Sequence, residues 1–177
     1  MPAIFETERL YIREFSDEDF PFLHAIFSDT ETMKHYPAPF SVEQTNNWIA
    51  RNKFRYEKDG FGLWSVCLKE TDEMIGDCGL VKQTVDGTDE VEIGYHINKK
   101  YWSKGYASEA ALGTREYGFG RLGLKRLISI ISPENIPSIR VAEKIGFTLE
   151  KESFIFNNPS YLCGLTNEIA SIFWGNP

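Results

Sequence analysis

The chain is poor in the residues that build metal sites and disulfide scaffolds. Its 177 residues include three histidines and three cysteines, Cys67, Cys78 and Cys163. An odd number of cysteines with no Cys-x-x-Cys pair favours reduced thiols, as in a cytoplasm, over a disulfide framework. We therefore expect a cytoplasmic protein. Because no cluster of cysteine and histidine is visible either, we expect no metal site.

The sequence also lacks the signals of a membrane protein and of a nucleic-acid-binding protein. No apolar run approaches the ~18 residues that span a bilayer, and the first residues show no basic patch followed by an apolar stretch. The formal net charge is −7, which disfavours nonspecific binding to nucleic acid. An acidic chain suits a cationic partner such as an amine, although acidity also serves solubility alone.

What the chain does contain is enough apolar surface for one sizeable core. It is 42% hydrophobic and 14% aromatic, a composition typical of a folded globule. The length predicts one domain over residues 1–177. Residues 166–177 form a tail that docks on the body, docks on a second subunit or stays partly ordered, and all three alternatives are open. Its apolar side chains are Ile169, Ile172, Phe173 and Trp174.

Hydrophobic periodicity and capping residues predict alternating strands and helices. Ser41-Val-Glu-Gln44 is a capping box at a helix start, and Gly146 is the expected C-cap of a later helix. One expected helix begins near Asp17, and three others cover 41–58, 107–118 and 138–145. The expected strands are 10–15, 63–69, 74–83, 90–98, 126–131, 148–156 and 161–165. This order predicts an α/β (α+β) protein with a mixed sheet and helices on both faces.

The segment Trp102-Ser-Lys-Gly105-Tyr-Ala107 joins a predicted strand to the start of a helix. Gly105 and Ala107 keep the backbone bare, so phosphate oxygens can approach its N–H groups. The helix that follows directs its unpaired N–H groups and the positive end of its dipole to the same place. This arrangement suits a pyrophosphate. Many helix starts carry a glycine, however, so the pattern is informative only together with a second motif.

The second motif is Asn135-Ile-Pro-Ser138-Ile-Arg-Val-Ala-Glu-Lys144-Ile-Gly146-Phe147. Together the two segments resemble the cofactor-binding core of the GNAT (GCN5-related) N-acetyltransferases, over roughly residues 7–165. Trp102 stands where that family carries Gln or Arg, which is similar to the branch of the ribosomal-protein-alanine N-acetyltransferases. The resemblance implies a mixed, mostly antiparallel central sheet with a splayed pair of strands. It also implies acetyl-CoA as donor and direct transfer to a primary amine in a ternary complex.

The resemblance further implies where the cofactor binds. Strands 90–98 and 126–131 are expected to splay, aided by a bulge near Ile93-Gly94, and the pantetheine arm pairs with the first strand as in β-augmentation. Asn135 is the expected side-chain partner of the pantetheine amides, or else a turn cap alone. Backbone contacts are expected at Tyr95, His96 and Ile97 for pantetheine, and at Ser103, Lys104, Gly105, Tyr106, Ala107 and Ser108 for the pyrophosphate.

Attack of an amine on a thioester calls for a base, an oxyanion donor and an acid. Glu92 is the expected base, directly or through a water, because a carboxylate on a partly buried strand needs a purpose or a partner. The alternative is a solvated strand carboxylate. The backbone N–H of Tyr95 is the expected oxyanion donor. Ser138 caps a helix or, as the resemblance suggests, lies against the cofactor near the sulfur and protonates the thiolate.

The acceptor amine is expected to bind among aromatic side chains and Glu92, although aromatic residues more often lie in a core. The candidates for the wall of this site are Tyr36, Phe61 and Trp64. None of the histidines, His24, His35 and His96, shows triad-like neighbours in the sequence. His96 is therefore expected to act through its backbone alone. The acceptor itself stays open between a protein N-terminus and a small amine such as a polyamine, an aminoglycoside or an amino acid.

Two functions of other classes are alternatives. One is a non-catalytic acyl-CoA-binding regulatory module, and the other is an interaction module that works through its Phe173-Trp174 tail. A homodimer is common among relatives and would suit the apolar tail. Gly118-Phe-Gly120-Arg-Leu-Gly123 spells a dinucleotide-binding pattern, but a predicted helix precedes it and a strand follows, which reverses the required order. We expect a helix end and a turn there.

Overall fold

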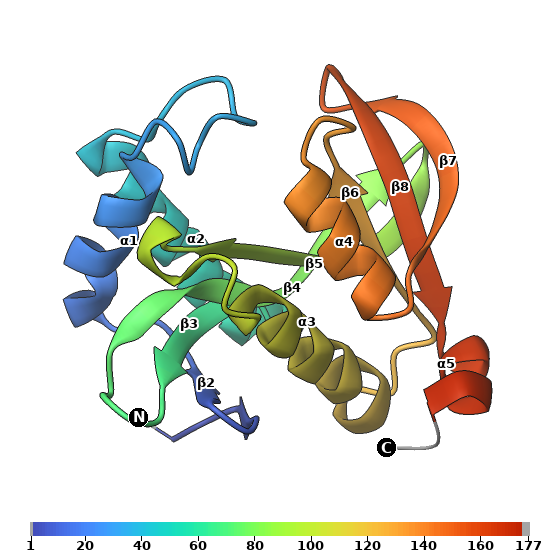
Figure 1. Ribbon diagram of the computed structural model, residues 1–177, viewed down its shortest axis with the longest axis horizontal. Coiled ribbons are helices and arrows are strands. Elements are labelled where there is room, and N and C mark those ends of the chain that lie inside the picture. The colour runs from blue at the N-terminus through green and yellow to red at the C-terminus, as the bar shows by residue number, and fades with distance from the viewer. Residues whose placement is uncertain (1, 175–177) are drawn as a thin grey trace.

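The computed structural model describes residues 2–174, which are built around an eight-stranded sheet (Figure 1). The strand order is β1-β2-β3-β4-β5-β6-β8-β7. Every neighbouring pair is antiparallel except β5 and β6, which are parallel. The mixed, mostly antiparallel sheet is therefore confirmed. The strands are β1 (Phe5–Glu6), β2 (Leu10–Arg13), β3 (Leu63–Leu68), β4 (Met74–Val85), β5 (Thr88–Ile97), β6 (Arg126–Ile131), β7 (Thr148–Ile155) and β8 (Asn158–Thr166).

Helices lie on both faces of the sheet, as predicted. Buried residues of α3 and α4 join one hydrophobic cluster, and buried residues of α1 and α2 join another on the opposite face. Figure 1 shows α3 and α4 in front of the sheet. The helices are α1 (Phe20–Phe27), α2 (Val42–Asp59), α3 (Tyr106–Glu116), α4 (Ile136–Lys144) and α5 (Asn167–Trp174), with short turns of helix at Asp17–Asp19, Lys99–Tyr101 and Tyr117–Arg121. None of the helices described in residues 2–174 is long and apolar enough to cross a membrane.

Helix α2 begins at the predicted capping box. Ser41 Oγ accepts a hydrogen bond from the Gln44 N–H at 3.2 Å, and the Gln44 side chain accepts one from the Ser41 N–H at 2.8 Å. Such a cap stabilises a helix by about 1 kcal/mol. The helix ends at Gly60, whose φ of 77° is left-handed and costs glycine little. These local signals set where α2 begins and ends, and its buried side chains pack with those of α1 on one face of the sheet.

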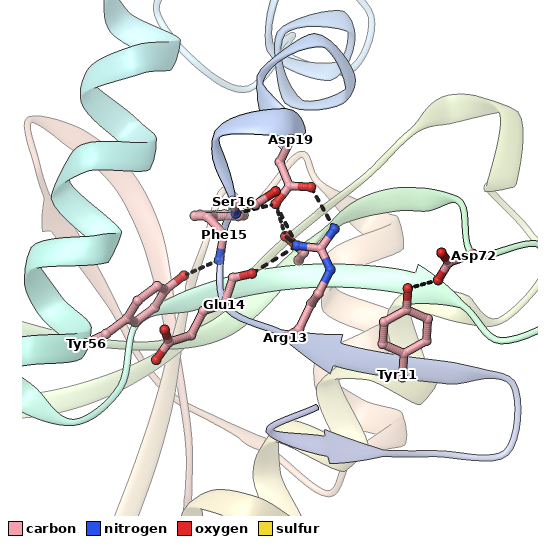
Figure 2. Close-up of polar contacts among 9 residues, drawn as sticks. Tyr11, Arg13, Glu14, Phe15, Ser16, Asp19, Tyr56 and Asp72 are labelled. Atoms are coloured by element: carbon pink, nitrogen blue, oxygen red, sulfur yellow. Dashed lines mark hydrogen bonds and ion pairs between the residues drawn. The ribbon is translucent and has the colours of Figure 1, made fainter. Parts of the chain in front are cut away.

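A buried ion pair fixes α1 to the sheet (Figure 2). The Arg13 guanidinium of β2 donates to both carboxylate oxygens of Asp19, at 2.8 and 2.7 Å. Asp19 also accepts hydrogen bonds from the Ser16 N–H and from Ser65 Oγ, each at 2.8 Å. Burial by itself raises the pKa of Asp19, but these hydrogen bonds prevail and lower it below its usual value. The pair therefore needs an ionised Asp19.

The start of α4 differs from the prediction. Asn135, not Ser138, is the N-cap, and its Oδ1 accepts a hydrogen bond from the Ser138 N–H at 3.3 Å. Ser138 thus lies inside the first turn of the helix. Gly146 follows the last turn with a φ of 85°, so the glycine predicted at this end is confirmed.

The tail begins with α5, which docks on the body at its first turns. Ala170 is buried in the same cluster as Leu165, and the Asn167 N–H donates to the Lys125 carbonyl at 2.9 Å. The side chains of Ile172, Phe173 and Trp174, which the sequence marked as apolar, lie outside the described residues. The Gly-x-Gly-x-x-Gly segment lies at the end of α3, where the Leu124 N–H donates to the Gly118 carbonyl at 3.0 Å. The predicted helix end is confirmed.

Candidate functional site

The parallel strands β5 and β6 part in the middle of the sheet, and Figure 1 shows them diverging. Among the described residues they are in register at one pair, Glu92 with Ile128. Next along β5, the Ile93 carbonyl accepts from Ser129 Oγ at 3.2 Å, and the Ile97 carbonyl accepts from Trp102 Nε1 at 2.7 Å. These carbonyls face away from β4. By the alternation of strand hydrogen bonds, the N–H and C=O of Tyr95 face the same gap.

The predicted bulge at Ile93-Gly94 is wrong for the pairing with β4. The register between β4 and β5 runs without a shift from Gly76 with Ile97 to Val85 with Thr88. The splay therefore arises on the β6 side alone. The same register directs the backbone of His96 toward β4, opposite Asp77, so the predicted backbone contact of His96 with pantetheine is wrong.

The loop before α3 has the form that the sequence suggested. Ser103 and Gly105 both take positive φ angles, 60° and 83°, and the helix begins at Gly105 without a side-chain cap. The first N–H groups of a helix have no partner within it, so those of Tyr106, Ala107 and Ser108 are available. This uncapped helix start beside the parted strands fits the pyrophosphate of a coenzyme A.

Arg9 supports this loop from the other end of the chain, and nothing in the sequence pointed to it. Its Nη1 donates to the Lys104 carbonyl at 3.0 Å, and its Nε pairs with Glu109 Oε2 of α3 at 2.7 Å. The guanidinium also lies 4.3 Å from the centre of the Tyr106 ring. Segments far apart in the sequence are thereby tied together, and only the fold reveals this contact.

The start of α4 faces β5. Tyr95 Oη donates to the Ser138 carbonyl at 3.3 Å, which links the strand that borders the gap to the helix. Asn135 uses its Oδ1 as the helix cap. The structure thus brings Tyr95, Asn135 and Ser138 together, as the resemblance implied.

Glu92 is half-buried at the point where β5 and β6 part. Its Oε2 accepts from Gln83 Nε2 at 2.8 Å, and its carboxylate also accepts from the Ile130 N–H. Burial raises the pKa of Glu92, and these hydrogen bonds together with the charges of His96 and Arg55 offset only part of that rise. A carboxylate with a raised pKa is a better proton acceptor than an ordinary one.

The side chain of His96 has two hydrogen-bond partners that the sequence did not reveal. The expectation of no triad-like neighbours was therefore wrong for His96. Its Nδ1 lies 2.8 Å from Oδ1 of Asp77, which is fully buried, and its Nε2 lies 2.5 Å from Tyr36 Oη. Trp48 Nε1 donates to the other oxygen of Asp77 at 2.9 Å. With the ring proton on Nδ1, the imidazole donates to Asp77 and accepts from Tyr36.

Tyr36 is the one aromatic candidate of the acceptor wall that remains accessible. It is 40% exposed, whereas Trp64 is 1% exposed and packs against Phe5 and Tyr117 on the α3 face of the sheet. Trp64 therefore belongs to the core, and its proposed contact with an acceptor was wrong. Phe61 is buried as well. Strand alternation explains Trp64, because its neighbour Leu63 faces the opposite side.

A parted pair of strands beside an uncapped helix start forms a site that suits a phosphate-bearing cofactor. A protein-family model described as "Acetyltransferase (GNAT) domain" matches residues 9–148. The chain belongs to this family and is an acetyltransferase.

Individual relatives support the same family. "Uncharacterized N-acetyltransferase YnaD" of Bacillus subtilis is 39% identical over 81% of this chain and 82% of its own length. A GNAT-family acetyltransferase from Bacillus anthracis has a TM-score of 0.78 and 35% identity, over 92% of this chain and 98% of its own. A ribosomal-protein-S5-alanine acetyltransferase from Vibrio fischeri shares the fold, with a TM-score of 0.71 and 20% identity over 93% and 96% of the two chains.

Proposed function

We propose that this enzyme transfers an acetyl group from acetyl-CoA to a primary amine, directly within a ternary complex. The observation that carries the proposal is the position of Glu92, a carboxylate of raised pKa at the point where two strands part. Our first choice of acceptor is a protein N-terminus, and a small amine such as a polyamine, an aminoglycoside or an amino acid is the alternative. The formal charge of −7 supports a cationic acceptor.

Acetyl-CoA, when bound, would supply the thioester carbonyl that the amine attacks. The backbone of Tyr95 and the N–H of Ile97 would hold the pantetheine, because both face the gap beside β5. Asn135 would add a side-chain contact. The backbone from Ser103 to Ser108 would hold the pyrophosphate at the start of α3. The N–H groups assigned to the pyrophosphate are those of Ser103, Lys104, Gly105, Tyr106, Ala107 and Ser108.

Three groups of the chain carry the proposed chemistry. Glu92 takes a proton from the attacking nitrogen, directly or through a water. The Tyr95 N–H faces the gap and donates to the oxygen that becomes negative. The Ser138 hydroxyl, in the first turn of α4, gives a proton to the leaving sulfur. The contact between Tyr95 Oη and the Ser138 carbonyl supports the pairing of these two residues at one site.

Release of free thiol from acetyl-CoA tests this function. The acceptors are short peptides with free N-termini, polyamines and aminoglycosides, and the blank contains no acceptor. We expect one amine class to accelerate thiol release above the blank. Tight binding of acetyl-CoA with no acceleration by any of these amines would contradict the proposal and favour a regulatory acyl-CoA-binding module. Absence of acetyl-CoA binding would contradict the assigned cofactor contacts as well.

A further inference from the structure

Glu92 and the Tyr36–His96 pair lie on one face of β5, on either side of Gly94. Residues 92, 94 and 96 share a face because side chains alternate along a strand, and four residues of strand separate the Cα atoms of Glu92 and His96 by about 13 Å. Gly94 has no side chain. Among the described residues, a Cβ placed there would meet one atom within 4 Å, Leu63 Cδ2 at 3.4 Å. A small group such as an amine therefore has room above Gly94.

Acetylation of an ammonium removes two protons from its nitrogen. The first leaves before the nitrogen can attack, since amines with a pKa of about 8 to 10 are mostly protonated at neutral pH. The second leaves as the amide forms, and the sulfur takes up one proton. The net release is one proton to solvent. With Glu92 alone, both protons would pass through the same carboxylate, whereas a second proton acceptor would separate the two steps.

We propose that Tyr36, His96 and Asp77 form this second proton acceptor, with Tyr36 in contact with the acceptor ammonium; the proposal rests on the amine acetylation proposed above. The ammonium N–H bond breaks as its proton passes to Tyr36 Oη. The original O–H bond of Tyr36 breaks as the phenol's own proton passes to His96 Nε2. Asp77 stabilises the resulting imidazolium at Nδ1. Once the product has left and solvent has entered the acceptor site, the proton returns to solvent by the reverse steps through Tyr36 Oη.

The surroundings of His96 place a buried carboxylate beside one ring nitrogen and aromatic rings around the imidazole. Its side chain is 9% exposed, and Asp77 of β4, fully buried, is its counter-ion at 2.8 Å. The rings of Phe27 from α1 and Trp48 from α2 lie 5.1 and 5.6 Å from the imidazole, centre to centre, and carry no charge. The negative charge of Glu92 acts on the same imidazole along β5.

The electrostatic environment of Tyr36 agrees with its role as a proton conductor that stays protonated at rest. Burial of its hydroxyl, followed by the charges of Asp77 and Glu92, raises the pKa of Tyr36 above its usual value. The phenol therefore donates to His96 and keeps its lone pairs for an N–H of the acceptor. Tyr36 is in this account a catalytic residue, and His96 and Asp77 act through it as positioning residues.

The test is the pH dependence of acetyl transfer in Tyr36→Phe, with a short peptide bearing a free N-terminal amine as acceptor. At about pH 6.5 the ammonium dominates, and we expect kcat to fall about 10²-fold, as for the loss of a general base. At about pH 9.5 the amine is already neutral, and we expect kcat within about threefold of the wild type. If a small amine is accepted instead, the upper pH is set above its pKa. His96→Gln should reproduce the pattern.

Tyr11→Phe is the matched control, because it also removes a hydrogen-bonded phenol hydroxyl. Tyr11 lies on the remote strand β2, and its hydroxyl donates to Asp72 (Figure 2). It should leave kcat unchanged at both pH values, and all variants should bind acetyl-CoA like the wild type in a thermal shift. An equal loss in Tyr36→Phe at both pH values, or no loss at either, would overturn the relay. A wild-type chain that acetylates no amine at all would overturn the proposed function and the relay with it.

Discussion

Replacing Glu92 by glutamine should lower activity and raise stability in the same protein. The side chain keeps its size and an oxygen that can accept from Gln83, but it can no longer take up a proton. Loss of a general base costs about 10²- to 10⁴-fold in kcat. We expect the lower end of this range, because the Tyr36–His96–Asp77 relay would still remove the first proton of the ammonium. Thiol release under saturating acetyl-CoA measures this loss.

The stability of the wild type depends on pH through Glu92, whereas the variant lacks this contribution. Because burial raises the pKa of Glu92 in the folded state, the folded protein prefers the protonated carboxyl. The stability that this preference contributes is full below the unfolded-state pKa of about 4.3 and is lost as pH rises through the folded-state value. A neutral amide at this position avoids the cost of a buried charge at neutral pH. Glu92→Gln should therefore unfold at a temperature about 2 to 4 °C higher at pH 7, for a gain of about 1 kcal/mol.

Asp89→Asn is the matched control, since Asp89 is an exposed carboxylate on the same strand. It should change neither kcat nor the melting temperature beyond the scatter of surface substitutions, about 0.5 kcal/mol. Full turnover by Glu92→Gln at every pH would refute Glu92 as the base. A loss of melting temperature at pH 7 would refute the argument that its buried charge is costly.

Three further substitutions test the acceptor space, the phosphate loop and the ion pair at α1. Gly94→Ala adds a methyl group in ordinary contact with one neighbouring atom, so the variant should fold. The acceptor KM should rise about tenfold, or about 1.4 kcal/mol. An unchanged acceptor KM would argue against binding above this residue. Arg9→Gln removes the donor to the Lys104 carbonyl and should weaken acetyl-CoA binding roughly fivefold in a calorimetric titration, with the amine KM unaffected. Asp19→Asn breaks the buried pair with Arg13 and should cost about 3 kcal/mol in urea unfolding at pH 7. Because the folded-state pKa of Asp19 is lowered, the wild type holds this stability above about pH 3.9 and loses it as pH falls through the folded value, whereas the variant should lack this acid-dependent loss.

Local signals in the sequence predicted the elements well, because their causes lie within a few residues. The capping box at Ser41, the glycine at 146 and the bare loop around Gly105 each act through neighbouring backbone atoms. The splay between two strands followed from the resemblance to a family. Asn135 and Ser138 were assigned to the right segment. Which of them caps α4 could not be predicted, because both residue types are good N-caps and they lie only three residues apart.

The relay could not be predicted, because its residues come from three segments that meet only after folding. Tyr36 lies in a loop, Asp77 on β4 and His96 on β5, and the register between β4 and β5 sets the last two opposite each other. Trp64 was misplaced for a related reason, since a short apolar run does not tell which face of a buried strand a side chain occupies. The role of Arg9 could not be predicted, because its polar contact joins it to Lys104, a residue far away in the sequence.

The most direct test of the account is the mass of the acceptor after incubation with the enzyme and acetyl-CoA. We expect a primary amine to gain one acetyl group, at a rate that depends on Glu92 and in equal amount to the thiol released. Thiol release without an acetylated amine, or an acetylated hydroxyl in place of the amine, would contradict it.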